Sequence, residues 1–220
     1  MALTFKEIRK NQDIRNYITE ADNTLGAMGF TEHSFAHVVR CVVIVRELLT
    51  KLNYSQREIE LGEIAAYMHD IGNVVNRIDH AQSGAIMTFR ILDKLGMDSS
   101  EIARIVTAIG NHDESTAVPV SPLSAALILA DKSDVRRSRV RNKNKANFNI
   151  HDRVNYAVTK KKVQIDEEKR IYSLILHIDT SICTVMEYFE IFMNRMMLCQ
   201  KAADFLHITF NLNINGMNII

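Results

Sequence analysis

Residues 65–73 read AAYMHDIGN, and the fold of the chain depends on what this stretch does. An apolar helical run ends in His69 and Asp70, at positions where the hydrophobic pattern predicts the protein core. Gly72 follows and is a typical helix stop. Because a buried carboxylate without a partner costs several kcal/mol, Asp70 requires a cation.

Helical patterns fill the first 140 residues. A capping box from Thr4 to Glu7 predicts the start of the first helix. Apolar periodicity, caps and glycine stops predict further helices over 32–52, 55–70, 80–95 and 98–112, and another that begins at Ser121 and Pro122. No strand pattern occurs before about residue 160, so this part should be a helical bundle.

The pattern changes after residue 160. KKKVQID and RIYSLILHID predict a hairpin, residues 181–203 predict a helix, and FLHITFNLNING alternates as a strand does. We therefore predict a mainly α fold with a small C-terminal α+β unit of β-β-α-β order. The expected domains are a helical domain over 1–140, a basic linker over 141–160 and the α+β unit over 161–220, which would serve either in dimerisation or as part of the rim of a substrate site.

Composition and charge set limits on the class of protein. Of 220 residues, 47% are hydrophobic and 24% are charged, which is ordinary for a globular protein. The net charge is only +1, yet residues 131–162 hold eleven Lys or Arg and three acids, which makes this segment +8. Such a run is either a solvated loop face or a phosphate-binding rim.

The location of the protein is predicted from its apolar segments and its cysteines. The first residues lack an apolar leader, and the aliphatic run at 41–45 is too short to cross a membrane. Cys41, Cys183 and Cys199 have no metal-like spacing and cannot all pair. These features predict a cytoplasmic protein with three core thiols and no membrane partner.

Histidines and aspartates recur on separate predicted helices. A single histidine on an apolar face is more often a hydrogen-bonded core residue than a ligand. Asp131, however, interrupts the apolar run of 125–130 and requires a cation just as Asp70 does. Two buried carboxylates and several imidazoles on one bundle can satisfy one another through metal. The histidines of this set are His37, His69, His80 and His112.

The order of these residues resembles the HD superfamily of metal-dependent phosphohydrolases. The matching stretches are HVVRC (37–41), MHDIGN (68–73), HAQSGA (80–85), NHDES (111–115) and LADKSD (129–134). The resemblance covers about residues 25–140 and implies an HD-type helical bundle. The chain has no Gly-Tyr-Pro motif, has Asn73 where that branch often has Lys, and lacks the long insertions of the triphosphohydrolase branch. The substrate subclass therefore stays open.

The resemblance implies a dinuclear centre of divalent transition metals, with Fe, Mn, Zn, Co and Ni all compatible with nitrogen and oxygen ligands. The first ion would be held by His37, His69, Asp70 and Asp131, and the second by His80, His112 and a bridging Asp70. Asp70, His80 and His112 are accordingly the expected catalytic residues. His33 stands one turn before His37 and is an alternative first ligand, a support for a ligand or a substrate contact.

Basic residues beside the last ligand are candidate substrate contacts. Lys132 follows Asp131 directly and Arg136 lies one turn beyond Lys132. We expect both, together with His33, to contact phosphate, with exposed surface charge as the alternative for each cation. Glu32, Asp113 and Glu114 lie near ligands in sequence and either orient them, act as an acid or are plain surface acids.

The resemblance predicts hydrolysis of a phosphate ester or anhydride, in a nucleotide, by a metal-bridged hydroxide. Two alternatives are a mixed-valent di-iron oxygenase of the same fold and a non-catalytic nucleotide-binding regulator. The expected partner is a phosphorylated small molecule. Nucleic-acid binding is not expected, because the basic run has few interleaved aromatic residues. The apolar helix over 181–203 predicts a homodimer, or else packing on the chain's own helical domain.

Overall fold

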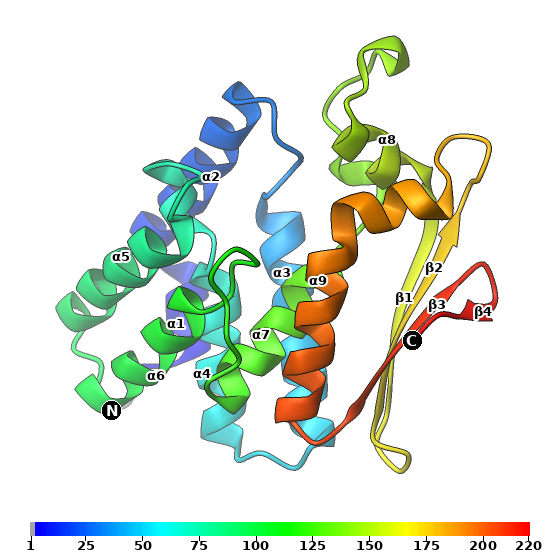
Figure 1. Ribbon diagram of the computed structural model, residues 1–220. Coiled ribbons are helices and arrows are strands. Elements are labelled where there is room, and N and C mark those ends of the chain that lie inside the picture. The colour runs from blue at the N-terminus through cyan, green and yellow to red at the C-terminus, as the bar shows by residue number, and fades with distance from the viewer. Residues whose placement is uncertain (1–2) are drawn as a thin grey trace.

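The computed structural model describes residues 3–220 and consists of a helical bundle beside a four-stranded sheet, with one long helix between them (Figure 1). The bundle contains α1 (Phe5–Lys10), α2 (Gln12–Ala27), α3 (Phe35–Lys51), α4 (Gln56–Met68), the short 3-10 helix η1 (Ile71–Val74), α5 (His80–Lys94), α6 (Ser99–Gly110) and α7 (Pro122–Lys132).

The C-terminal part begins with two short 3-10 helices. Its elements are η2 (Arg137–Arg139), η3 (Lys145–Asn147), α8 (Ile150–Ala157), β1 (Val158–Asp166), β2 (Ile171–Ile178), α9 (Val185–Phe205), β3 (Thr209–Ile214) and β4 (Met217–Asn218). The predicted fold class, a helical bundle with a small C-terminal α+β unit, is confirmed.

The sheet has the order β1-β2-β3-β4. β1 pairs antiparallel with β2, whereas β2 and β3 run parallel, as the intervening α9 allows. The alternating sequence of β3 buries Phe210, Leu212 and Ile214 on one face. The sheet thereby presents an apolar surface to α9.

Helix α9 lies between the sheet and the bundle (Figure 1). It contacts β3 on one side and α7 on the other, and its side chains Tyr188, Phe192 and Met196 are buried. A helix with apolar residues on more than one face can bury them only between two layers. This packing fixes the C-terminal unit against the last helix of the bundle.

Helices α2 and α8 and the short strand β4 were not predicted from the sequence, which indicated only three strands. Helix α2 begins at an asparagine cap, where the Asn11 side chain accepts a hydrogen bond from the Ile14 N–H. Helix α8 lies within 141–160, the range expected to be a basic linker, and buries Val154 and Ala157. Within residues 3–220, no helix is both long enough and apolar enough to cross a membrane.

Candidate metal centre

Six side chains from five elements of the bundle converge on one buried point. Helix α3 contributes one histidine, the end of α4 contributes the His-Asp pair, α5 begins with a histidine, α6 is followed by one, and α7 carries the second aspartate near its end. These residues are His37, His69, Asp70, His80, His112 and Asp131, which are the six ligands that the sequence predicted.

Two glycines allow α5 to approach the end of α4. A Cβ atom at Gly72 would lie 2.0 Å from the His80 carbonyl oxygen, which is far inside van der Waals contact. A Cβ at Gly84 would lie 3.2 Å from the carbonyl oxygen of His69. The glycine two positions after Asp70 therefore does more than stop a helix, because it lets the histidine at the start of α5 reach the His-Asp pair.

The first group of donor atoms lies between α3, α4 and α7. The Nε2 atom of His37 is 3.3 Å from Nε2 of His69 and 3.3 Å from Oδ1 of Asp131. Oδ2 of Asp70 lies 3.5 Å from His37 Nε2 and 3.3 Å from His69 Nε2. Four donor atoms thus face one small volume.

The second group lies between α5 and the end of α6. His80 Nε2 and His112 Nε2 are 3.2 Å apart. Oδ1 of Asp70 lies 3.7 Å from the first and 4.0 Å from the second. The two oxygens of Asp70 therefore face different pairs of histidines, an arrangement that suits a carboxylate between two ions.

Each of the four imidazoles is oriented by its other nitrogen. In His69, His80 and His112, Nδ1 lies 2.6–3.0 Å from the backbone carbonyl oxygen three residues earlier in the chain. A carbonyl only accepts, so Nδ1 carries the hydrogen and Nε2 presents a lone pair. In His37 the partner of Nδ1 is Oδ2 of Asp134, at 2.9 Å. Such partners orient metal-ligating histidines in proteins.

These donor atoms fit a divalent metal. Lone pairs that face one another at about 3.3 Å repel unless a cation lies between them. Oδ2 of Asp70 is buried and accepts no hydrogen bond from residues 3–220. A buried carboxylate oxygen without a donor is expected where a cation completes the site. The set of imidazole and carboxylate donors suits the transition metals predicted from the sequence.

The charge states of the two histidines in the second group also fit metal binding. Burial lowers the pKa of His112 to about 3, and burial likewise lowers the pKa of His80, so both rings are neutral at pH 7. Metals bind the neutral imidazole.

Sequence reasoning missed two residues next to the ligands. Cys41, expected to be a core thiol, places its Sγ 3.8 Å from Nε2 of His37 and belongs to a possible metal-holding group with His37, His69 and Asp131. Cys41 is one helical turn after His37 and therefore lies on the same face of the helix, and this spacing could have indicated from the sequence that it is close to the ligands. Asp134, which orients His37, lies at the end of the LADKSD stretch but was not singled out.

The structure separates His33 from the donor group. Its Nδ1 lies 2.7 Å from the Thr31 carbonyl oxygen, and its ring centre is 5.5 Å from that of His37. Its side chain lines the space beside the ligands. This position suits a substrate contact and leaves His37 with the other ligands.

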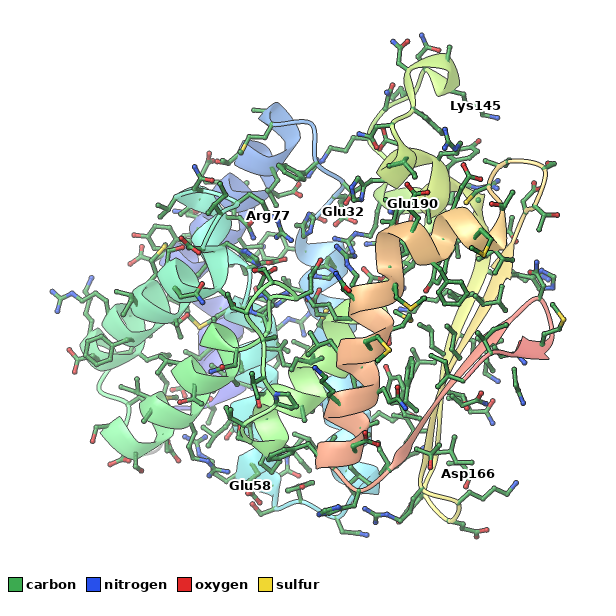
Figure 2. All side chains as sticks on the ribbon, in the orientation of Figure 1. Glu32, Glu58, Arg77, Lys145, Asp166 and Glu190 are labelled. Carbon is green, nitrogen blue, oxygen red and sulfur yellow. The ribbon has the colours of Figure 1, made fainter. Side chains whose placement is uncertain are left out.

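Lys132 and Arg136, the two cations predicted to contact phosphate, lie in different positions relative to the ligands. Lys132 is buried, with Nζ 2.6 Å from Oδ2 of Asp131 and 2.7 Å from Oε2 of Glu114, and it lines the same space. Arg136 pairs instead with Glu32 and Asp134, and it does not line the cavities described below. Figure 2 shows Glu32 near the end of the bundle that faces α8.

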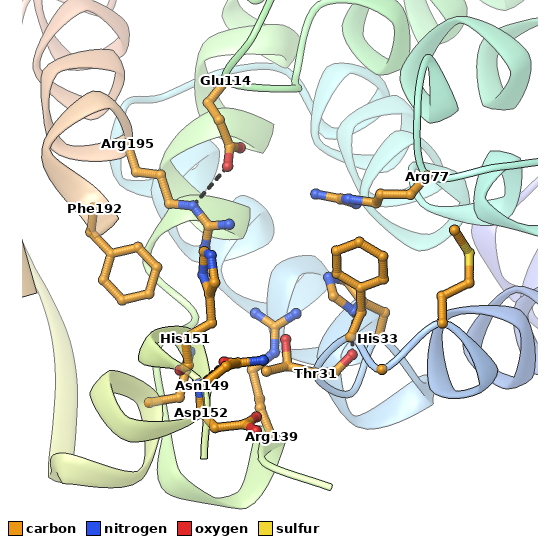
Figure 3. A pocket seen from close by; sticks show the side chains of 14 residues that line it. Thr31, His33, Arg77, Glu114, Arg139, Asn149, His151, Asp152, Phe192 and Arg195 are labelled. Carbon is orange, nitrogen blue, oxygen red and sulfur yellow. Dashed lines mark hydrogen bonds and ion pairs between the residues drawn. The ribbon is translucent and has the colours of Figure 1, made fainter. Parts of the chain in front are cut away.

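A cavity opens from the metal centre toward α8 and α9 (Figure 3). A narrow space beside the ligands is lined by Lys132, His33 and three arginines, Arg77, Arg139 and Arg195. His33 and the arginines also line a larger cavity of about 370 Å³. The arginines come from the loop before α5, from η2 and from α9. The sequence singled out none of them, although Arg139 belongs to the basic segment 131–162 that was predicted to be either a solvated face or a phosphate-binding rim.

Comparison with known proteins identifies the family. The HD domain model matches residues 34–174, a span of more than half the chain that includes all six predicted ligands, and the chain belongs to the HD domain family. The family predicted from the sequence is thereby confirmed. HD domain membership and the buried histidine and aspartate group together support a metal-dependent hydrolase.

The other two comparisons give less information about the family. A search of the curated proteins finds no significant match. Among solved structures, a "predicted HD superfamily hydrolase" from an uncultured Thermotogales bacterium is 24% identical to this chain, with a TM-score of 0.46. That match covers 61% of this chain and 75% of the bacterial protein.

Proposed function

We propose that the protein is a metal-dependent phosphohydrolase that cleaves a phosphate ester or anhydride of a nucleotide at a dinuclear centre. The observation that carries the proposal is the position of four cationic side chains, Lys132 and the three arginines, around the space beside the ligands. Phosphate oxygens are the ligands for which clustered guanidinium groups are best suited.

The two-ion part of the proposal rests on Asp70. One of its oxygens faces His37 and His69, and the other faces His80 and His112. When bound, two divalent ions would polarise phosphoryl oxygens and lower the pKa of water to near neutrality. Six protein donors are available for them, and Asp134 holds His37 in the tautomer that a metal needs.

The side chains of this site would position a phosphate group. Arg77 has Nη1 3.3 Å from Nε2 of His80, so its guanidinium lies at the edge of the donor group. Arg139 is held by the carbonyl oxygens of Glu32 and Asp134, both at 2.8 Å. Guanidinium groups fixed in this way lose little entropy when they bind phosphate oxygens. Lys132 is already paired with Asp131 and Glu114, so its ammonium group would offset the negative charge of these two carboxylates in the site.

The test is phosphate release by protein stripped with chelator and reloaded with single metals. Nucleotides, p-nitrophenyl phosphate and a bis(p-nitrophenyl) diester are the substrates. We expect metal-dependent release from a nucleotide, and a loss of at least about a thousandfold in His80→Ala. His177→Ala, at an exposed histidine on β2, is the matched control and should retain activity. Metal-loaded protein that releases no phosphate but consumes oxygen with a polyol or phosphonate would instead support a di-iron oxygenase.

A further inference from the structure

The cavity next to the metal centre has two parts that differ in charge. We call the part lined by His33, Arg77, Arg139 and Arg195 the neck, because these residues border both the ligand space and the larger cavity. We call the rest of the larger cavity the chamber. Figure 3 shows the three guanidinium groups directed toward the middle of the cavity from different sides.

The neck is cationic, but its arginines are not equally compensated. Arg195 pairs through Nε with Oε1 of Glu114 at 2.9 Å, and its guanidinium carbon lies 4.8 Å from the Phe192 ring centre. Arg77 has only a distant ion pair, with Nη2 3.9 Å from Oδ1 of Asp113. The neck therefore keeps positive charge available for one phosphate group.

The chamber carries the opposite charge. Among the described residues that line it beyond the neck, none is Lys or Arg, and two are acids. Glu114 is already paired with Lys132 and Arg195, whereas Asp152 is only 7% exposed and forms no ion pair with a Lys or Arg among residues 3–220. A second phosphate placed in this chamber would meet the Asp152 carboxylate in a partly buried environment, which costs binding energy.

The remaining chamber residues suit an uncharged, partly aromatic group. Phe30 lines the chamber and is 41% exposed, and Phe192, which Figure 3 labels, also borders it but is only 1% exposed. Asn155 donates its amide to the His151 carbonyl oxygen at 2.9 Å, which leaves its own oxygen as an acceptor. With the Asp152 carboxylate, this wall offers acceptors to hydroxyl or amino donors. A volume of about 370 Å³ is within the range of roughly 300–1,000 Å³ that is typical of small-molecule pockets.

We infer that the chamber is a leaving-group site that selects a phosphate monoester of an uncharged, aromatic, hydrogen-bond-donating alcohol, in chemical terms a nucleoside monophosphate, and excludes nucleoside di- and triphosphates. The inference rests on the proposed function for the cleavage step and goes beyond it in naming the substrate class. Phe30 comes from the loop between α2 and α3, but Asp152 and Asn155 come from α8 and Phe192 from α9, so the C-terminal part of the chain takes part in recognition.

The first experiment tests the charge of the chamber with Asp152→Asn, which keeps the shape of the side chain. Wild-type protein should prefer a nucleoside monophosphate over the diphosphate by at least about tenfold in kcat/KM. In Asp152→Asn the KM for the monophosphate should rise severalfold and the preference should shrink, because a carboxylate no longer repels the second phosphate. Asp204→Asn, an exposed acid on α9, is the control and should leave both values unchanged.

The second experiment measures binding without turnover. A nucleoside has no phosphate ester for this protein to cleave. Calorimetry on metal-loaded protein should therefore detect nucleoside binding in the chamber without turnover. Phe30→Ala should weaken nucleoside binding by at least about fivefold through lost stacking. Phe89→Ala removes an equally exposed ring on α5, outside the cavity, and should not change the affinity.

The outcomes separate the two proposals. Wild-type protein that cleaves di- or triphosphates as well as monophosphates, or nucleoside affinity that is the same in Phe30→Ala, would overturn the chamber assignment. Absence of phosphate release from every substrate would contradict the proposed function instead. In that case calorimetry with nucleoside mono- and diphosphates would still show whether the protein binds the monophosphate more tightly than the diphosphate.

Discussion

Asp70 is the residue on which the metal centre depends most. It lies at the end of a buried helix, and its two carboxylate oxygens face two different pairs of imidazoles. The other donors serve one group each. Asp70 is also the residue whose position in an apolar run first indicated a bound cation, so the sequence argument and the geometry agree on it.

Asp134 is expected to act on the metal through His37. Its Oδ2 accepts from Nδ1 of that ring at 2.9 Å, and its other oxygen contacts Arg136 and Lys161. Burial alone would raise the pKa of Asp134, but the bond from His37 and the charge of Arg139 hold the pKa well below its usual range. Asp134 is therefore a permanent anion beside a ligand.

Replacement of Asp134 by Ala should lower metal affinity by about 10- to 100-fold, which is the usual effect of removing a partner of a metal-ligating histidine. Asp134→Asn keeps an acceptor for the ring and should retain more of the affinity. Competition with a chromophoric chelator measures both, with Asp93→Ala, an exposed acid on α5, as control. Equal affinity in Asp134→Ala and wild-type protein would show that this contact does not orient the ring.

Residue-scale sequence reasoning located the ligands but not the arginines, and the reason is physical. A polar residue inside an apolar helical run, such as Asp70 or Asp131, conflicts with the local pattern and is therefore visible. Arg77 and Arg139 lie in polar segments and conflict with nothing there, whereas Arg195 does interrupt the apolar run of 191–199 and was overlooked. They become a group only when three distant segments meet, which no local pattern records.

At the scale of elements, the contact between η1 and α5 sets the geometry of the centre. Gly72 and Gly84 let these elements approach until backbone atoms are in contact. Gly72 is also the second residue of η1, which leads from the His-Asp pair toward His80. A side chain at Gly72 would push α5, and His80 with it, away from Asp70.

Gly72→Ala should therefore lower the free energy of unfolding by about 1–3 kcal/mol and reduce metal content. Thermal and denaturant unfolding measure the first, and elemental analysis measures the second. Gly110→Ala is the matched control, because its new Cβ would meet its nearest neighbour at an ordinary 3.8 Å. If Gly72→Ala were as stable and as rich in metal as the control, the close approach of α5 would not be required.

Element boundaries were predicted well where caps and periodicity agree. Ser55 and Ser121 form the side-chain caps expected of them, and the strict alternation of β3 is visible in its sequence. Helix α2 was missed because a single asparagine, Asn11, both ends α1 and caps α2. The segment over 141–160 was assigned from its charge, which does not reveal the buried face of α8.

At the scale of the whole molecule, α9 joins two layers and still leaves apolar side chains outside. Met186, Met193 and Met197 follow one another at helical spacing and are 77%, 47% and 46% exposed. Packing of α9 on α7 provides the intramolecular contact that the sequence left open as an alternative to dimerisation. Because these three methionines remain exposed, we still propose that the outer face of α9 forms the interface of a homodimer.

We expect light scattering to give the mass of a dimer at micromolar concentration. Met193→Glu should shift the protein to monomer, because a charge buried at an interface without a partner is costly. Ile86→Glu, at an exposed position on α5, should not change the mass. A wild-type protein that is strictly monomeric at this concentration would rule out the dimer.

The number of metal ions that one chain holds is the most direct test of the proposed dinuclear centre. Elemental analysis of wild-type protein should give two transition-metal ions per chain, and His80→Ala should retain one, because the group around His37 is intact. Asp70→Ala should be close to empty, since only Asp70 faces both groups. One ion per wild-type chain, or full metal content in Asp70→Ala with the fold retained by circular dichroism, would contradict a dinuclear centre organised by Asp70.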